Sequence, residues 1–170
     1  MLLRTHVAAA MTFATLTAPQ GALPYALAAS VIGAIIPDLD TRFPHRAGGS
    51  PFTQSPIRHR GVTHSLAFVA LTACGLSLLP YPLTIPYTAG FLLHVLLDSL
   101  TRSPVFLLWP LNFPFHPPSV LHRRGLRTGG LADNLLCLLL ILTFLFSIFA
   151  SAPGHLFSSF PPQRHQRAKR

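Results

Sequence analysis

The feature that most limits the fold of this chain is a series of five apolar stretches separated by more polar segments. They run approximately over residues 5–18, 22–37, 64–79, 83–101 and 131–150. A membrane-spanning helix needs about 20 apolar residues, within a range of about 17–25. The last two stretches meet this length, the third is marginal and the first two are short. We therefore predict an all-α, multi-pass transmembrane helical bundle with about four or five membrane helices.

The composition supports a membrane protein over a soluble one. Half of the residues are hydrophobic and 10% are charged, whereas a soluble domain carries about 25% charged residues. The formal net charge of +9 also suggests nucleic acid as a partner. However, the basic residues lie in short clusters between the apolar stretches, and no basic surface is interleaved with the aromatic residues that stack on bases. We expect membrane lipids as partners and no nucleic acid.

The polar segments define the domain organisation. We predict a single membrane-embedded domain over residues 1–150, with a polar, basic loop at 41–63 and a basic, disordered tail at 151–170. The stretch 104–115 is apolar, but three prolines interrupt it and block a continuous helix. It is typical of an interfacial or re-entrant loop, or of a connector that lies on the lipid head groups.

The arginines indicate an orientation. If the N-terminus is cytoplasmic, the loops at 41–63 and 102–130 both lie on the cytoplasmic side and together hold eight arginines. The turns near Pro19 and Pro80 on the opposite side hold none, as the positive-inside rule predicts. The basic tail conflicts with this orientation if all five stretches cross the membrane.

The acidic residues are few and lie at the ends of apolar stretches. All four are aspartates: Asp38 and Asp40 end the second stretch, Asp98 lies near the end of the fourth, and Asp133 opens the fifth. An ionisable residue at membrane depth is costly and is by default a candidate functional residue. Because helices that cross alternately up and down bring these ends to one face, we expect the aspartates to meet there.

Three histidines belong to the same set of helix ends. His6 opens the first stretch, His64 opens the third, and His94 precedes Asp98 by four residues, which places both on one face of a helix. Imidazole nitrogens and carboxylate oxygens are ligands for zinc, and also for manganese or iron. We therefore predict a divalent metal site, with zinc as the first candidate, as one open site or two adjacent metals.

Each of these residues also has a purely structural interpretation. The segment 37–40 could be a turn, His64 could simply end a helix, and His94 with Asp98 could be a buried hydrogen-bonded pair. For Asp133, a helix N-cap is as well supported as metal ligation. The convergence of all these residues on one face favours the metal site.

Four segments resemble, in order, the bacterial YdjM-like family of inner-membrane metal-dependent hydrolases. They are Pro37-Asp38-Leu39-Asp40, His59-Arg60-Gly61-Val62-Thr63-His64-Ser65, His94-Val95-Leu96-Leu97-Asp98-Ser99-Leu100-Thr101 and Leu107-Leu108-Trp109-Pro110. The resemblance covers the chain from His6 to about Asp133. It implies a multi-pass helical protein of the inner membrane, a bound divalent metal and hydrolase activity. It places metal ligands at His6, Asp38, Asp40, His59, His64, His94 and Asp98.

The chain departs from the family pattern at three places. Thr41-Arg42 stands where His-Pro is usual, a change expected to remove one ligand, and Arg102-Ser103-Pro104 stands where Pro-x-Gly is usual. Asp133 takes the place of a glutamate near the start of the last helix.

Together these features predict a metal-dependent hydrolase at the cytoplasmic membrane surface, with a lipid-related or phosphoester substrate. Asp40 or His59 would act as the general base, and Arg60 would hold an anionic group such as phosphate. Ser65 is expected to begin a helix rather than to act as a nucleophile.

Two other classes of function use the same residues. A divalent-cation transporter would place its ligands near the bilayer midplane, on broken helices. A non-catalytic membrane protein, whose metal only staples the helices together, would have a closed shell of four ligands.

Overall fold

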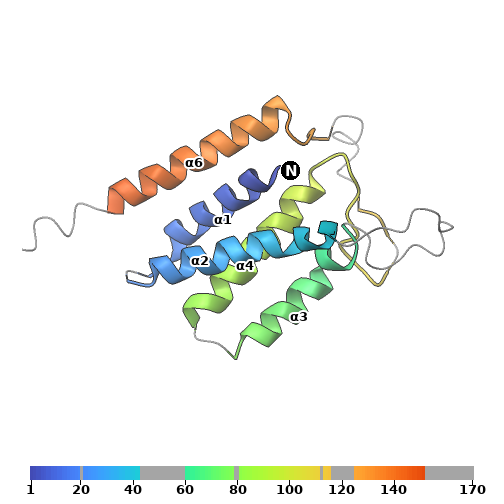
Figure 1. The fold of residues 1–170 in the computed structure, drawn as a ribbon, viewed down its shortest axis with the longest axis horizontal. Coiled ribbons are helices and arrows are strands. Elements are labelled where there is room, and N and C mark those ends of the chain that lie inside the picture. The colour runs from blue at the N-terminus through green and yellow to red at the C-terminus, as the bar shows by residue number, and fades with distance from the viewer. Residues whose placement is uncertain (20, 43–59, 79–80, 112, 116–124, 152–170) are drawn as a thin grey trace, which may run out of the picture.

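The computed structural model of the chain describes residues 1–19, 21–42, 60–78, 81–111, 113–115 and 125–151 (Figure 1). Its α-helices are α1 (Leu3–Thr17), α2 (Leu23–Ile35), α3 (Leu66–Leu76), α4 (Tyr81–Ser99) and α6 (Leu131–Ser151), and its 3-10 helices include η1 (Ile36–Arg42) and η3 (Val62–His64). Within the described ranges, β-structure is limited to isolated bridges, so the prediction of an all-α fold is confirmed there. The predicted disordered tail and most of the predicted basic loop lie outside the described residues.

The helices follow the five apolar stretches, and ordinary helix signals set their ends. Ser65 is the N-cap of α3, and its hydroxyl accepts a hydrogen bond of 3.1 Å from the backbone N–H of Phe68, as Ser residues commonly do at this position. A proline lies in the first turn of α2, where it costs no intrahelical hydrogen bond. The apolar stretch 104–115 contains no helix among its described residues and instead forms backbone hydrogen bonds with Arg60 and with Leu66 at the start of α3.

The helices pack side by side across the molecule, in an order that differs from their order in the chain. α6 contacts α1, α1 contacts both α2 and α4, and α3 packs on α4 at the opposite side (Figure 1). Tyr87 and Phe91 of α4 form the centre of the apolar core, where Phe68 of α3 meets Phe91 edge to face. Val95 and Val105 are fully buried in the same cluster, so the end of α4 and the loop after it share one core.

The closest helix contact joins α2 and α4 through two glycines. A Cβ atom on Gly33 would collide with the backbone carbonyl of Tyr87, and one on Gly90 would collide with the backbone carbonyl of Ser30. Only a residue without a side chain lets two backbones approach this closely, as at many helix contacts within membranes. The spacing between α2 and α4 therefore depends on both glycines.

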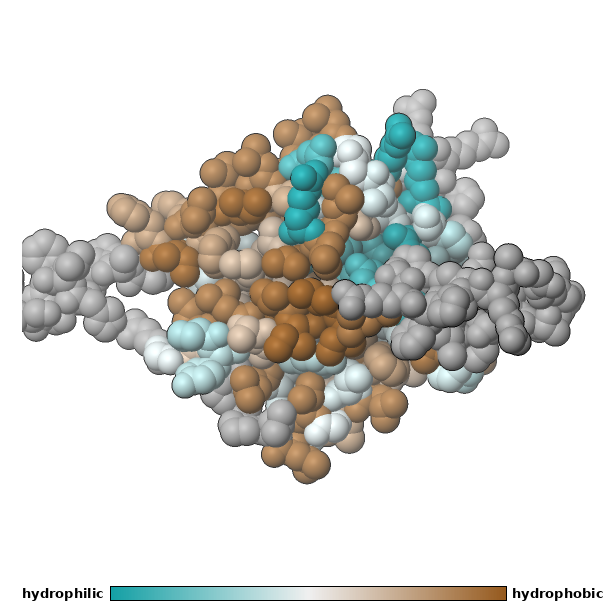
Figure 2. Space-filling model, viewed as in Figure 1, coloured by the Kyte–Doolittle hydropathy of each residue, from teal (hydrophilic) through white to brown (hydrophobic). Residues whose placement is uncertain are grey.

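Within the described residues, two helices are long and apolar enough to cross a membrane, judged by length and composition. They are the segment Leu23–Asp40, which joins α2 to η1, and Leu131–Ala150 in α6. The fifth stretch is thus a candidate span, as predicted. The fourth, which forms α4 and was also predicted to be long enough, is not one of the two, whereas the second, predicted to be short, becomes long enough together with η1. α4 carries tyrosine, proline, threonine, histidine and aspartate, which lower its mean hydropathy. Figure 2 shows apolar residues over most of the visible face, with the most hydrophilic ones gathered toward the end where α1 begins.

Candidate metal centre

Five helix ends meet at one end of the bundle. The N-termini of α1 and α6, the C-terminus of α4 and the two 3-10 helices all lie at the same end (Figure 1). This arrangement brings His6, Asp38, His64, His94 and Asp98 together. The expectation that an up-and-down order of helices would gather these residues is confirmed by the distances between them.

The five side chains form two overlapping groups of potential metal ligands. His6, His94 and Asp98 make up one group, and Asp38, His64 and His94 make up the other. In each group, one ligand atom from each residue lies within 4.8 Å of the others. His94 is the member that the two groups share. Four of the side chains are 0–3% exposed, whereas Asp38 is 29% exposed, so solvent reaches the cluster at Asp38.

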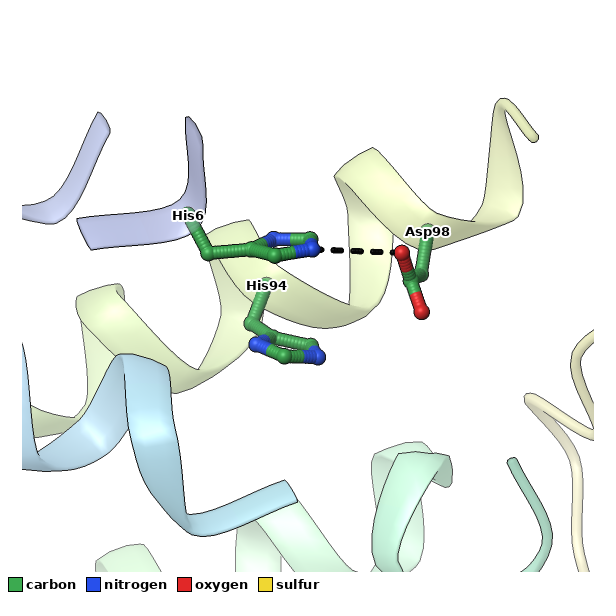
Figure 3. A group of neighbouring side chains, drawn as sticks. All are labelled: His6, His94 and Asp98. Carbon is green, nitrogen blue, oxygen red and sulfur yellow. Dashed lines mark ion pairs between the residues drawn. The ribbon is translucent and has the colours of Figure 1, made fainter. Parts of the chain in front are cut away.

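The separations between donor atoms suit ligands of a shared cation. Asp98 Oδ1 lies 3.2 Å from His6 Nε2 (Figure 3), and Asp38 Oδ1 lies 3.5 Å from His94 Nε2. His64 Nε2 lies 3.7 Å from Asp98 Oδ2 and 3.8 Å from Asp38 Oδ1. Most of these separations exceed a hydrogen bond. Two ligands about 2.0–2.2 Å from a tetrahedral zinc are about 3.3–3.6 Å apart, which is close to the observed range.

His94 directs one ring nitrogen, Nε2, into the cluster, while its other ring nitrogen, Nδ1, bonds to the backbone of α2. Its Nδ1 lies 2.6 Å from the backbone carbonyl of Ala34, and because a carbonyl only accepts, Nδ1 carries the hydrogen. In the neutral ring, Nε2 then carries a lone pair, and this buried atom has no hydrogen-bond partner among the described residues. It faces Asp38 Oδ1, another electron-rich atom. A histidine whose second nitrogen is fixed by a carbonyl in this way is typical of metal ligands.

His6 stacks on His94 and also has a ring nitrogen without a hydrogen-bond partner in the described part of the chain. The two rings are 3.8 Å apart between centroids and nearly parallel, at 15° (Figure 3). Its Nδ1 is buried without a hydrogen bond to any described residue, whereas its Nε2 faces Asp98 Oδ1 at 3.2 Å, an ion-pair distance. Burying polar atoms without partners costs free energy. A bound cation would satisfy one of these nitrogens, so the donor set fits a divalent metal.

His64 lies in η3, and its ring contacts Thr63 and Asp40 on the side away from the cluster. Nδ1 is 3.1 Å from Thr63 Oγ1, which in turn donates a hydrogen bond of 2.6 Å to Asp40 Oδ2. Burial and the nearby His94 lower the pKa of His64 to about 3, against the opposing effect of the three aspartates. His64 is therefore neutral at pH 7, which is the form that binds metals.

Arg60 holds Asp98 and the loop that follows α4. Its guanidinium lies 3.0 Å from Asp98 Oδ2 and donates hydrogen bonds to Thr101 Oγ1 at 2.7 Å and to the Ser103 carbonyl at 3.1 Å. The α-amino group of Met1 also contacts Asp98. The backbone of Arg60 has a φ of +66°, an uncommon conformation for a residue other than glycine. Arg60 thus links the carboxylate to the loop.

The structure places the remaining predicted residues differently. Asp40 is 2% exposed and lies behind His64, outside both groups of potential ligands. His59 lies outside the described residues. Thr63 and the carbonyl of Ala34 contact the histidines as well and were not among the predicted residues, although Thr63 belongs to the His-Arg-Gly-Val-Thr-His-Ser motif.

Asp133 is held by three hydrogen-bond donors and lies outside both groups. It accepts hydrogen bonds from Thr5 Oγ1 at 2.6 Å, from the backbone N–H of Leu2 at 3.1 Å and from that of Gly129 at 2.8 Å. The carboxylate therefore fastens the start of α6 to the start of α1, next to His6. Of its two interpretations, this geometry favours a cap over a ligand.

Replacing Asp133 with alanine is expected to destabilise the fold by about 2–4 kcal/mol, because it leaves three donors without their charged acceptor. Asp133→Asn, which keeps an acceptor oxygen, is expected to lose less. Chemical unfolding in detergent measures both values, with Thr143→Ala as the control. The Thr143 hydroxyl donates a hydrogen bond to the Leu139 carbonyl of its own helix. A loss below about 0.5 kcal/mol for Asp133→Ala would contradict the fastening role.

Comparison with known proteins identifies relatives over most of the chain. Residues 1–155 match the family described as YdjM inner membrane protein. The chain is 32% identical over 117 residues to the Inner membrane protein YdjM of Escherichia coli (strain K12), and equally to that of Shigella flexneri. These matches cover 62% of this chain and 60% of each relative, so the chain spans about three fifths of their length. No solved structure matches.

Proposed function

The chain belongs to the YdjM family of inner membrane proteins, and on that premise we propose that it is a membrane-bound, metal-dependent hydrolase. The observation that carries the proposal is the buried cluster of three histidines and two aspartates, in which His6 and His94 have ring nitrogens without hydrogen-bond partners among the described residues. Such a cluster is costly to bury in an apolar bundle unless something satisfies it.

The proposed ligands are His6, His64, His94, Asp38 and Asp98. Two carboxylates balance the charge of a divalent cation, and three imidazoles with carboxylates suit zinc, with manganese or iron as alternatives. Such a cation supplies Lewis-acid polarisation of a substrate oxygen and makes water more acidic. Because His94 has only Nε2 to offer, it can serve one cation, and we propose one cation shared by the cluster.

Asp38 is the residue best placed to take a proton from water, through the carboxylate oxygen that would not bind the cation. It is the exposed member of the cluster, and a general base must lie within reach of the water it activates. Asp40 was the expected base, but its buried position behind His64 makes Asp38 the better candidate. Arg60 beside the cluster is paired with Asp98, but a divalent cation together with Arg60 would outweigh the charges of Asp38 and Asp98 by one unit, and this excess positive charge would favour an anionic substrate such as a phosphoester.

The position of the cluster at one end of the bundle suits a substrate at the membrane surface. The helices are proposed to form a multi-pass bundle of four or five membrane helices, with the arginine-rich loops and the cluster on the cytoplasmic side. The loop after α4 exposes large apolar side chains, among them Leu108, Leu111 and Phe113. An apolar loop beside the proposed anion-binding site supports a lipid-related phosphoester as the substrate.

Asp38→Asn is expected to lower hydrolysis by about 100-fold or more, because it removes the proposed base. It leaves the group of His6, His94 and Asp98 intact, so part of the bound metal is expected to remain. The test purifies the protein in detergent, measures metal content, and assays phosphodiesters, phosphomonoesters and carboxylic esters, each with and without an acyl chain. Thr143→Ala is the matched control and is expected to behave as the wild type.

The other classes of function give different outcomes in the same experiments. Bound metal without turnover of any substrate would overturn the hydrolase and support a metal that only staples the helices. Flux of Zn²⁺ or Mn²⁺ into proteoliposomes would instead support a cation transporter.

A further inference from the structure

We infer that Thr63 and Asp40 form a positioning relay that fixes the ring of His64, and that Asp40 itself does not bind the metal. The inference rests on the proposed metal site and concerns how one of its ligands is oriented. The sequence predicts Asp40 as a metal ligand and as a general base. Here Asp40 instead orients His64, and Thr63 provides the link between the two.

The directions of the hydrogen bonds follow from what each group can donate. A carboxylate only accepts, so the single hydroxyl hydrogen of Thr63 points to Asp40 Oδ2, at 2.6 Å. The oxygen of Thr63 is then left as an acceptor for His64 Nδ1, 3.1 Å away. Nδ1 therefore carries the ring hydrogen, and the lone pair of the neutral ring lies on Nε2.

The other side of the His64 ring faces the metal cluster. Nε2 lies 3.7 Å from Asp98 Oδ2 and 3.8 Å from Asp38 Oδ1, which places its lone pair toward the two proposed carboxylate ligands. Asp40 Oδ2 is 3.7 Å from Nδ1, beyond a direct hydrogen bond, so the contact between Asp40 and the ring passes through Thr63.

The backbone of η3 holds the relay in place. The N–H of His64 bonds to the carbonyl of Gly61 at 3.1 Å, and the N–H of Ser65 bonds to that of Val62 at 3.1 Å. Thr63 and His64 therefore sit in one rigid turn, with Thr63 directed to Asp40 in η1. The ring of His94 is oriented in the same way, because its Nδ1 donates a hydrogen bond to the Ala34 carbonyl. Two ligands thus present Nε2 to the cluster because separate acceptors hold their Nδ1 atoms.

Thr63→Val, which keeps the shape but removes the hydroxyl, is expected to weaken Zn²⁺ affinity by about 10–100-fold, the usual effect of losing a group that orients a ligand. Thr63→Ser keeps the hydroxyl and is expected to restore most of the affinity. Asp40→Asn is expected to weaken it less than Thr63→Val. The double variant is expected to match Thr63→Val alone, because both changes interrupt one relay. Chelator competition in detergent measures the affinities.

A second measurement is independent of the metal. ¹⁵N NMR of the histidine rings reports which nitrogen carries the hydrogen, and the His64 signal is assigned by comparison with His64→Ala. The relay predicts the Nδ1–H form in the wild type and in Thr63→Ser, and a mixture of both forms in Thr63→Val.

The outcomes separate this inference from the proposed function. If the wild type binds no metal but shows the Nδ1–H form, the proposed metal site fails and the relay stands. Wild-type Zn²⁺ affinity in Thr63→Val, or loss of affinity in Asp40→Asn as complete as in His94→Ala, would overturn the relay. Should Thr63→Val fail to fold, the affinity of Asp40→Asn relative to His94→Ala still decides whether Asp40 is a ligand or a positioning residue. The Nδ1–H form in Thr63→Ser then tests the need for the hydroxyl.

Discussion

Replacing His94 with alanine is expected to reduce metal binding more than any other single change in the cluster. His94 is the one residue common to both groups of potential ligands, so its loss leaves neither group with three members. The affinity for Zn²⁺ is expected to fall by more than about 100-fold, beyond the effect of losing an orienting group. Measured metal content should fall from about one cation per chain to a trace.

Changes at the other two histidines provide the comparison. His6→Ala leaves Asp38, His64 and His94, and His64→Ala leaves His6, His94 and Asp98. Each variant therefore keeps one complete group of three, which His94→Ala does not, and we expect its affinity to lie between those of the wild type and His94→Ala. Isothermal titration of metal-free protein in detergent gives the order. Equal affinities for His94→Ala and the wild type would exclude the cluster as a metal site.

The positions of the site residues at helix ends could be predicted from the sequence alone. The apolar stretch 83–101 corresponds to α4, which spans Tyr81–Ser99, and the stretch 131–150 corresponds to α6, which spans Leu131–Ser151. Hydrophobic length and helix-breaking residues determine such boundaries locally. Since consecutive helices alternate in direction, the meeting of His64 with His94 and Asp98 followed from the order of the helices.

The roles of individual side chains could not be predicted, because they depend on contacts between residues far apart in the chain. Asp133 could cap a helix or bind metal, and its contacts with Thr5 and Leu2, which favour the cap, span 128 and 131 residues. Asp38 and Asp40 are two residues apart, yet the 3-10 turn of η1 places Asp38 in the cluster and Asp40 behind His64. Neither distinction is encoded in residue type or spacing.

The largest expected effect on stability comes from adding one methyl group between α2 and α4. Gly90→Ala and Gly33→Ala each place a Cβ atom against a backbone carbonyl, that of Ser30 or Tyr87. A backbone cannot move aside as a flexible side chain can, so the two helices must separate. Overpacking a tight contact typically costs about 1–3 kcal/mol, and against backbone we expect about 3 kcal/mol or more. Chemical unfolding in detergent measures the loss.

Gly75→Ala in α3 is the matched control, because nothing lies within 4 Å of the Cβ atom that it adds. Alanine favours helix over glycine by about 1 kcal/mol, so this variant is expected to be as stable as the wild type or slightly more so. The same separation of α2 from α4 would lengthen the hydrogen bond from His94 to Ala34. Gly90→Ala protein that still folds is therefore expected to bind Zn²⁺ more weakly, whereas Gly75→Ala is not. Equal stability of Gly90→Ala and Gly75→Ala would show that the two helices are not in close contact, and the orientation assigned to His94 would then lose its basis.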